Sequence, residues 1–173
     1  MRRAALVLLL AAWLLPGAAA AAPAAPTPTP GGLLVTDVEL VELAPSDQRY
    51  DQAEDAARAV MLSRRIRAAI VASGRYRVLD RGPADRQPPY RYMDCKACIL
   101  DWARQRGAQR VLVVWLQKES RLILMLNMAL IDVRQPQQAL AGGSVDLRGD
   151  TDETWLAGAS QMLERTLGVA MTP

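Results

Sequence analysis

The chain has 173 residues, with 21 Lys and Arg against 18 Asp and Glu, and it contains no histidine. The positive charges are scattered among the acids rather than gathered into a stripe, which argues against a nucleic-acid-binding surface. Without histidine the chain lacks Ser-His-Asp and Cys-His catalytic machinery and most zinc and copper sites, so we predict no catalytic residues, no cofactor and no metal ion.

The N-terminus has the three-part layout of a secretory signal peptide. Arg2 and Arg3 precede an apolar stretch that is shorter than the roughly 20 residues of a membrane-spanning helix, and small alanines follow. We predict a signal peptide over 1–22, with a retained anchor as the alternative, and a linker rich in Pro, Thr and Ala over 23–32. Cleavage removes two basic residues and leaves 19 against 18 acids. The mature chain is then expected to be periplasmic, without a transmembrane span.

The remaining residues, 33–170, are enough for a single folded domain with its own core. Alternating apolar residues predict a strand over 33–43, and an acidic capping pattern predicts a helix over 51–73. Six side chains are expected to be buried on this helix: Ala56, Val60, Leu62, Ile66, Ala69 and Ile70. Gly74 is the expected terminator of the helix, and a short strand follows over 75–80.

A loop with several prolines over 81–93 leads to a helix over 95–106, for which Asp94 is the expected N-cap. A short, continuously apolar run over 110–117 predicts a central strand that is buried on both faces. The long apolar segment over 122–133 then returns as an antiparallel strand. The second half of the chain therefore begins with a strand hairpin.

Two further elements complete the predicted domain. Residues 139–147 form a third strand of the meander, with a β-bulge expected at the glycine pair 142–143. An acidic pattern at 150–153 caps the last helix. The order strand-helix-strand-helix-strand-strand-strand-helix predicts an α/β fold with a single mixed sheet, parallel in its first half and an antiparallel meander in its second, with helices packed on the sheet.

Cys95 and Cys98 are the only cysteines, and both lie at the predicted start of the second helix. The helix dipole and Lys96 favour a thiolate, which supports a redox-active pair. In a regular helix the two β-carbons are too far apart for a disulfide, so bridging requires Cys95 to lie at the cap, outside helical dihedrals. We expect a local structural disulfide, with free thiols and a redox-active pair as the alternatives.

The hairpin after the central strand has a charged tip, which is a candidate site for an anionic partner; a solvated turn is the alternative. Its residues are Lys118, Glu119, Ser120 and Arg121. A small ligand could instead bind where the parallel strands end, near Asp80 and 117–120, as is usual in open α/β sheets.

Three segments carry a resemblance to a known family: 98–108, 115–124 and 144–155. On these segments the chain resembles small secreted bacterial proteins known only as a domain of unknown function. The helix end and strand over 73–78 are more loosely similar to the amino-terminal domain of TolB and the periplasmic domain of CsgG. These resemblances imply a role in envelope assemblies without enzymatic activity, and they imply no catalytic residue.

We therefore predict a periplasmic, non-enzymatic accessory protein that binds an envelope or exported partner protein. A thiol-disulfide redox protein that uses Cys95 and Cys98 is one alternative, and a small-ligand-binding domain is another.

Overall fold

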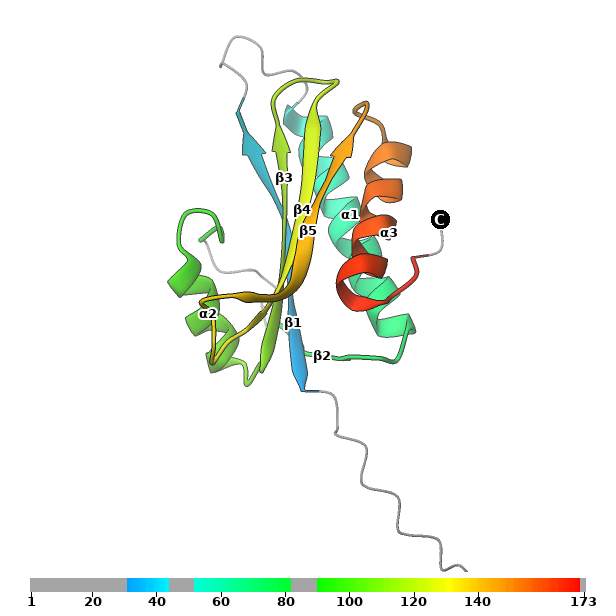
Figure 1. Ribbon diagram of the computed structural model, residues 1–173. Helices are drawn as coiled ribbons and strands as arrows, with labels where there is room; N and C mark the ends of the chain where they lie inside the picture. The colour runs from blue at the N-terminus through cyan, green and yellow to red at the C-terminus, as the bar shows by residue number, and fades with distance from the viewer. Residues whose placement is uncertain (1–30, 44–51, 82–89, 172–173) are drawn as a thin grey trace, which may run out of the picture.

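The computed structural model describes residues 31–43, 52–81 and 90–171 (Figure 1). In chain order its elements are β1 (Gly32–Glu42), α1 (Gln52–Ala72), β2 (Arg77–Val78), α2 (Lys96–Gln105), β3 (Arg110–Lys118), β4 (Leu124–Asp132), β5 (Ala139–Leu147) and α3 (Asp152–Leu167). The predicted signal peptide and nearly all of the predicted linker lie outside the described residues. Within these ranges no helix combines the length and the apolar character that a membrane span needs.

The described strands form one sheet in the order β2-β1-β3-β4-β5. β1 pairs in parallel with β2 and β3, whereas β3, β4 and β5 pair in antiparallel fashion. The parallel neighbours are joined by crossovers that contain helices, and the antiparallel neighbours are joined by hairpins. The predicted α/β fold with a mixed sheet is therefore confirmed.

Helices cover the two faces of the sheet unequally. α1 and α3 lie side by side on one face, and the much shorter α2 lies on the other (Figure 1). The larger core fills the space between the sheet and the two long helices, and Trp155, Leu112 and Leu126 are among its fully buried members. A smaller core lies under α2 and includes Trp102 and Val113. Because α2 has only ten residues, it covers only part of its face.

Helix α1 buries a different set of residues from the predicted one. Ala56 is exposed and Val60 is 50% exposed, while Asp55 and Ser63 face inward. α1 carries apolar residues on two sides, so apolar spacing alone does not say which side is buried. The inward polar residues have partners that the sequence does not show: the Ser63 hydroxyl accepts the Val38 N–H at 2.9 Å. Leu62, Ile66 and Ile70 are buried as predicted, and Ala69 is partly buried against the same core.

Two helices begin differently from the prediction. Cys95 is the N-cap of α2, whereas Asp94 pairs with Arg91 at 2.7 Å. The N-cap of α3 is Thr151, which forms a reciprocal capping box with Thr154. A disulfide sulfur and a hydroxyl therefore act as the cap acceptors in place of the predicted carboxylates, and Asp94 and Asp150 are held in ion pairs instead.

Both edges of the sheet are bonded by arginine side chains from the flanking segments. On the β1 edge, Arg67 Nη2 donates to Val35 O at 2.7 Å. On the β5 edge, Arg165 Nη1 of α3 donates to Ser144 O at 3.3 Å. An open sheet edge presents unpaired backbone groups that invite association with other chains, and charged side chains are one way of covering them.

The glycine pair in β5 does not form the predicted bulge. The register shift in β5 lies at Leu140, whereas Gly142 and Gly143 pair regularly with Ala129 and Met128. Gly142 is needed for a different reason: a Cβ there would lie 2.4 Å from the Met128 carbonyl oxygen. The absence of a side chain therefore allows close approach of β5 to β4.

We expect Gly142→Ala to lower the free energy of unfolding by about 1–3 kcal/mol, because the added methyl group forces the two strands apart. Gly143→Ala is the matched control, since its φ of 153° is close to the 155° of Gly142 but its Cβ would meet nothing closer than 3.8 Å. Urea denaturation of both variants measures the difference. Equal losses for the two variants would show that backbone strain, and not the strand contact, sets the requirement for glycine.

A buried ion cluster joins β3 to α1 and α3. The Lys118 ammonium, at the end of β3, lies 2.5 Å from both Asp55 Oδ2 and Asp150 Oδ2. Arg58 Nη1 lies 3.4 Å from Asp55 Oδ1 and 3.2 Å from Asp150 Oδ1. The indole Nε1 of Trp155 also donates to Asp150 Oδ1, at 3.0 Å. The cluster therefore fixes the start of both long helices against the end of the central strand.

The ion cluster raises the pKa of Lys118. Burial lowers the pKa of Lys118, but the hydrogen bonds and negative charges of Asp150 and Asp55 outweigh burial and raise the pKa above its ordinary value of 10.5. A lysine pKa that is raised in the folded state adds stability below the unfolded pKa, and this stability is lost as pH rises through the folded pKa.

We expect Lys118→Met to lower the free energy of unfolding by about 3–5 kcal/mol, because it leaves Asp55 and Asp150 buried without their ammonium partner. Chemical denaturation at neutral pH measures this loss. The neighbouring Glu119→Gln is the control and is expected to change stability by less than about 0.5 kcal/mol. A small loss for Lys118→Met, similar to that of the control, would contradict the role of the cluster.

The same cluster predicts a dependence on alkaline pH. As pH rises beyond 10.5, the wild-type protein is expected to lose the stabilisation that Lys118 provides. The midpoint of thermal unfolding, followed by circular dichroism through this range, should fall more steeply for the wild type than for Lys118→Met. Parallel curves for the two proteins would contradict the raised pKa.

Candidate functional site

A disulfide joins Cys95 and Cys98 at the start of α2, with their Cα atoms 5.3 Å apart. Cys95 has φ −146° and ψ 85°, outside the helical region, as bridging at this spacing requires. The Cys98 N–H donates to Cys95 Sγ at 3.2 Å, so the sulfur also caps the helix. The bridge thus fixes the first turn of α2.

The segment before α2 is bonded to the sheet. Glu39 is 4% exposed and accepts the N–H groups of Tyr92 and Met93. Burial raises the pKa of the Glu39 carboxyl, and the two N–H donors partly oppose that shift. The Tyr92 ring packs on Trp115 of β3 with 6.0 Å between centroids, and the Lys96 ammonium of α2 lies 5.6 Å from the Tyr92 centroid. These contacts cover the sheet as far as Trp115.

Beyond these contacts, no described helix covers this face of β3, β4 and β5. We call this surface the open face; it consists of two rows of side chains in register, Gln117, Met125 and Asp146 in one row and Trp115, Asn127 and Ser144 in the other. Two hollows lie on it, one of about 90 Å³ near the β3–β4 hairpin and one of about 490 Å³ over Asn127 and the glycine pair of β5. Most of its side chains are half-buried or exposed.

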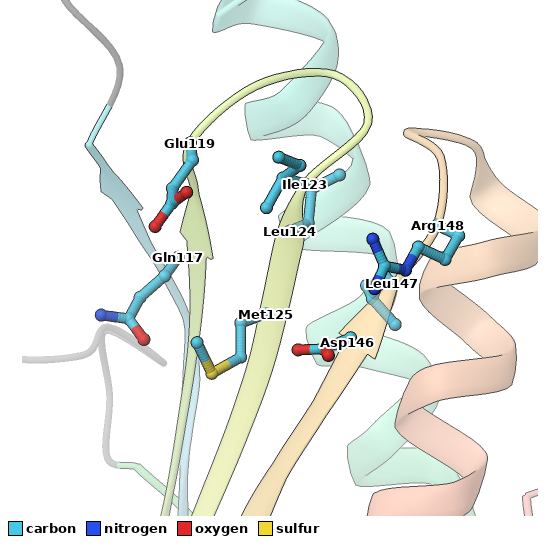
Figure 2. A pocket seen from close by; sticks show the side chains of 8 residues that line it. All are labelled: Gln117, Glu119, Ile123, Leu124, Met125, Asp146, Leu147 and Arg148. Atoms are coloured by element: carbon cyan, nitrogen blue, oxygen red, sulfur yellow. The ribbon is translucent and has the colours of Figure 1, made fainter.

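Figure 2 shows the smaller hollow. Gln117, Met125 and Asp146 come from three neighbouring strands, and the Met125 thioether lies between the amide and the carboxylate. Glu119 follows Gln117 toward the hairpin, and Arg148 lies beyond the end of β5. The hollow therefore has an apolar centre and groups of both charges around it.

Asn127 is the one buried polar side chain of the open face, with 7% exposure. Its Nδ2 donates to Gln117 Oε1 at 3.2 Å and to Met125 O at 3.1 Å. This contact fixes the orientation of the Gln117 amide, so that its Nε2 is the group left to donate outward. The two amides of Gln117 and Asn127 are thus held in a fixed orientation on the open face.

The hairpin tip is less charged and more apolar than predicted. Lys118 does not belong to it, because its ammonium is buried in the ion cluster. Ser120 shapes the turn: its Oγ accepts the N–H groups of Leu122 and Ile123, both at 3.2 Å. Leu122 and Ile123, predicted to begin the next strand, lie in the turn and are 71% and 51% exposed. Of the four residues predicted for the charged tip, Lys118 is therefore buried, while Glu119, Ser120 and Arg121 lie at the tip beside the two apolar side chains, and their binding of a partner stays a prediction.

The sequence contained a signal for the burial of Lys118. Alternation along β3 places Lys118 on the same side as Val114 and Leu116, which face the larger core. A charged residue at an inward position needs a charged partner, and that partner lies far away in the sequence.

The structure does not bring together the residues of the predicted ligand site. β2, which precedes Asp80, pairs with Gly32 and Leu33 at the start of β1, whereas Gln117 pairs with Val41 near its end. At about 3.3 Å per residue these positions are roughly 25 Å apart along the strand. The prediction of one ligand site near Asp80 and 117–120 is therefore wrong.

The side chains of the open face are suited to non-covalent binding. It offers an indole, a thioether, amides, a hydroxyl and a carboxylate, which bind through hydrogen bonds and apolar contacts. Among the described residues, no three Cys, Asp or Glu side chains are grouped so as to hold a metal ion.

The family model described as a protein of unknown function (DUF2380) matches residues 32–167, which are the residues where β1 begins and α3 ends. A search of curated proteins gave no match.

Solved structures with similarity to the chain come from several bacteria. The LpoB C-terminal domain from Salmonella enterica is 17% identical, with a TM-score of 0.48 over 69% of this chain and 84% of that chain. A PelC dodecamer from Paraburkholderia phytofirmans is 15% identical, with a TM-score of 0.42 over 79% of this chain and 86% of that chain. Lipoprotein GNA1162 from Neisseria meningitidis is 17% identical, with a TM-score of 0.41 over 71% and 84%.

Proposed function

The chain belongs to the family described as proteins of unknown function (DUF2380), and we propose that it is a non-enzymatic domain that binds a partner protein in the cell envelope. In this proposal residues 1–22 direct export, 23–32 form a linker and 33–170 form one binding domain in the periplasm. The disulfide supports this location, because disulfides persist in oxidising compartments. The partner is an envelope or exported protein.

The open face is the observation that carries the proposal. Trp115 and Met125 belong to residue types that are enriched at protein interfaces, and Asn127 holds the neighbouring amide in a fixed orientation. The exposed pair Leu122 and Ile123 extends the same surface over the hairpin tip. Exposed apolar groups that adjoin a flat polar surface are typical of a docking site.

The charges of the hairpin tip do not favour an anionic partner. With Lys118 in the ion cluster, the remaining tip charges are one acid, Glu119, and one base, Arg121. The two charges balance, so the tip lacks the positive excess on which an anionic partner would depend. We therefore propose that apolar contacts at the tip and hydrogen bonds on the open face select the partner.

Site-specific photo-crosslinking in the native host tests this function. A photoreactive amino acid in place of Ser144, which is exposed on the open face, is expected to give a discrete adduct with one envelope protein. The same amino acid in place of Gln161, exposed on α3 away from the open face, is the control and is expected to give none. Equal adduct patterns at both positions, or no adduct at Ser144, would contradict the proposal.

The hairpin tip is tested with the partner recovered in that way. Replacing both Leu122 and Ile123 by Ser is expected to weaken binding at least about tenfold, because burying a Leu or Ile side chain against a partner contributes about 1 kcal/mol or more. The free energy of unfolding should change little, since both side chains are largely exposed. Calorimetry with purified components measures the affinity, and unchanged affinity would remove the tip from the binding surface.

A further inference from the structure

A groove of about 830 Å³ lies between the second half of β1 and α1. α1 packs on the opposite face of the sheet from α2, so this groove is separate from the open face. Among the described residues, β2 pairs only with Gly32 and Leu33 of β1. From Val35 to Glu42, the outer edge of β1 therefore has no neighbouring described strand.

Side chains make the hydrogen bonds that a neighbouring strand would make along this edge. The contacts are Arg67 Nη2 to Val35 O at 2.7 Å, Val38 N to Ser63 Oγ at 2.9 Å, and Arg91 Nη1 to Leu40 O at 3.2 Å. Two backbone carbonyls and one amide of β1 thus face the groove. Each can pair with the backbone of an added strand once its present partner moves aside.

The wall of the groove on α1 is apolar. Val60 and Val71 line it and are 50% and 58% exposed. They lie on the second apolar side of α1, the side that the sheet does not cover, together with Ala56 and Ala68. A strand placed along β1 would direct alternate side chains toward these residues.

The groove also carries an excess of positive charge. Four arginines line it against two acids: the arginines are Arg64, Arg67, Arg81 and Arg91, and the acids are Asp37 and Glu39. Arg91 is also paired with Asp94 outside the lining, at 2.7 Å, so the balance is +1 when Asp94 is counted. Glu39 is occupied by two backbone N–H groups, and Asp37 pairs with Arg81 at 2.6 Å. Arg64 is exposed and forms no hydrogen bond or ion pair with a described residue. The groove is therefore complementary to negative charge.

We propose that this groove binds an extended acidic segment of a partner protein, which adds as a strand along β1. Backbone N–H groups of the segment replace the guanidinium groups at Val35 O and Leu40 O. The displaced Arg67 guanidinium, together with Arg64, then pairs with carboxylates of the segment, while Arg91 keeps its ion pair with Asp94. Apolar side chains on the other side of the segment pack on the two valines of α1.

Model peptides test the proposal with the whole protein purified from its host. The probe is a fluorescent peptide of alternating valine and glutamate, as long as the open stretch of β1, and its matched forms carry glutamine or lysine in place of glutamate. Fluorescence anisotropy is expected to show saturable binding of the glutamate peptide, at least about tenfold weaker binding of the glutamine peptide and none of the lysine peptide. Added salt should weaken the binding.

Two exposed positions locate the peptide on the protein. Arg64→Glu and Val60→Gln are each expected to weaken binding of the glutamate peptide by about three- to tenfold. Arg134→Glu, an equal charge change at the exposed turn after β4, is the control and should leave binding unchanged. Amide shifts in nuclear magnetic resonance spectra should cluster in β1 and α1.

The outcomes that overturn the proposal are distinct. Equal binding of the glutamate and lysine peptides, no saturable binding of the glutamate peptide, or an equal effect of Arg134→Glu would each overturn it. A second copy of the chain is the competing occupant. Sedimentation that shows a dimer abolished by Arg64→Glu would assign the groove to self-association and overturn the proposal. None of these results depends on the open face.

Discussion

The ion pairs of Lys118 are the constraint on which the arrangement of the helices depends. A buried ammonium needs carboxylates close by, and here they come from the first turn of α1 and from the residue just before the N-cap of α3. Both long helices are therefore fixed at the same end of β3 and on the same face of the sheet. The opposite face is left to the short α2, and the open face exists because α2 does not reach its far half.

The order of elements and the sheet topology follow from local patterns. Alternation in β1 and β3, and Gly74 with its left-handed φ of 62° after α1, are sufficient to predict these elements from the residues. Contacts between distant residues are not visible in this way. Lys118 is separated by 63 residues from Asp55 and by 32 from Asp150, so no local pattern indicates the cluster. The same contacts explain why α1 turns Asp55 inward and leaves Val60 outside.

Individual residues of the candidate site can be recognised in the sequence, but the surface that they form together cannot. Trp115 of β3 and Asn127 of β4 are visible in the sequence, but whether a helix covers them depends on how far α2 extends over the sheet. Leu122 and Ile123 continue an apolar run, so alternation assigns them to a strand. Ser120 instead accepts both of their N–H groups and holds them in a turn. A local hydrogen bond thus outweighs the strand pattern.

The arginines at the sheet edges also affect the association of one molecule of this protein with another. Val35 O on one edge and Ser144 O on the other are already bonded to guanidinium groups. Two molecules that meet edge to edge must first break these bonds and bring like charges together, which opposes edge-to-edge pairing of two copies more than the addition of an acidic strand.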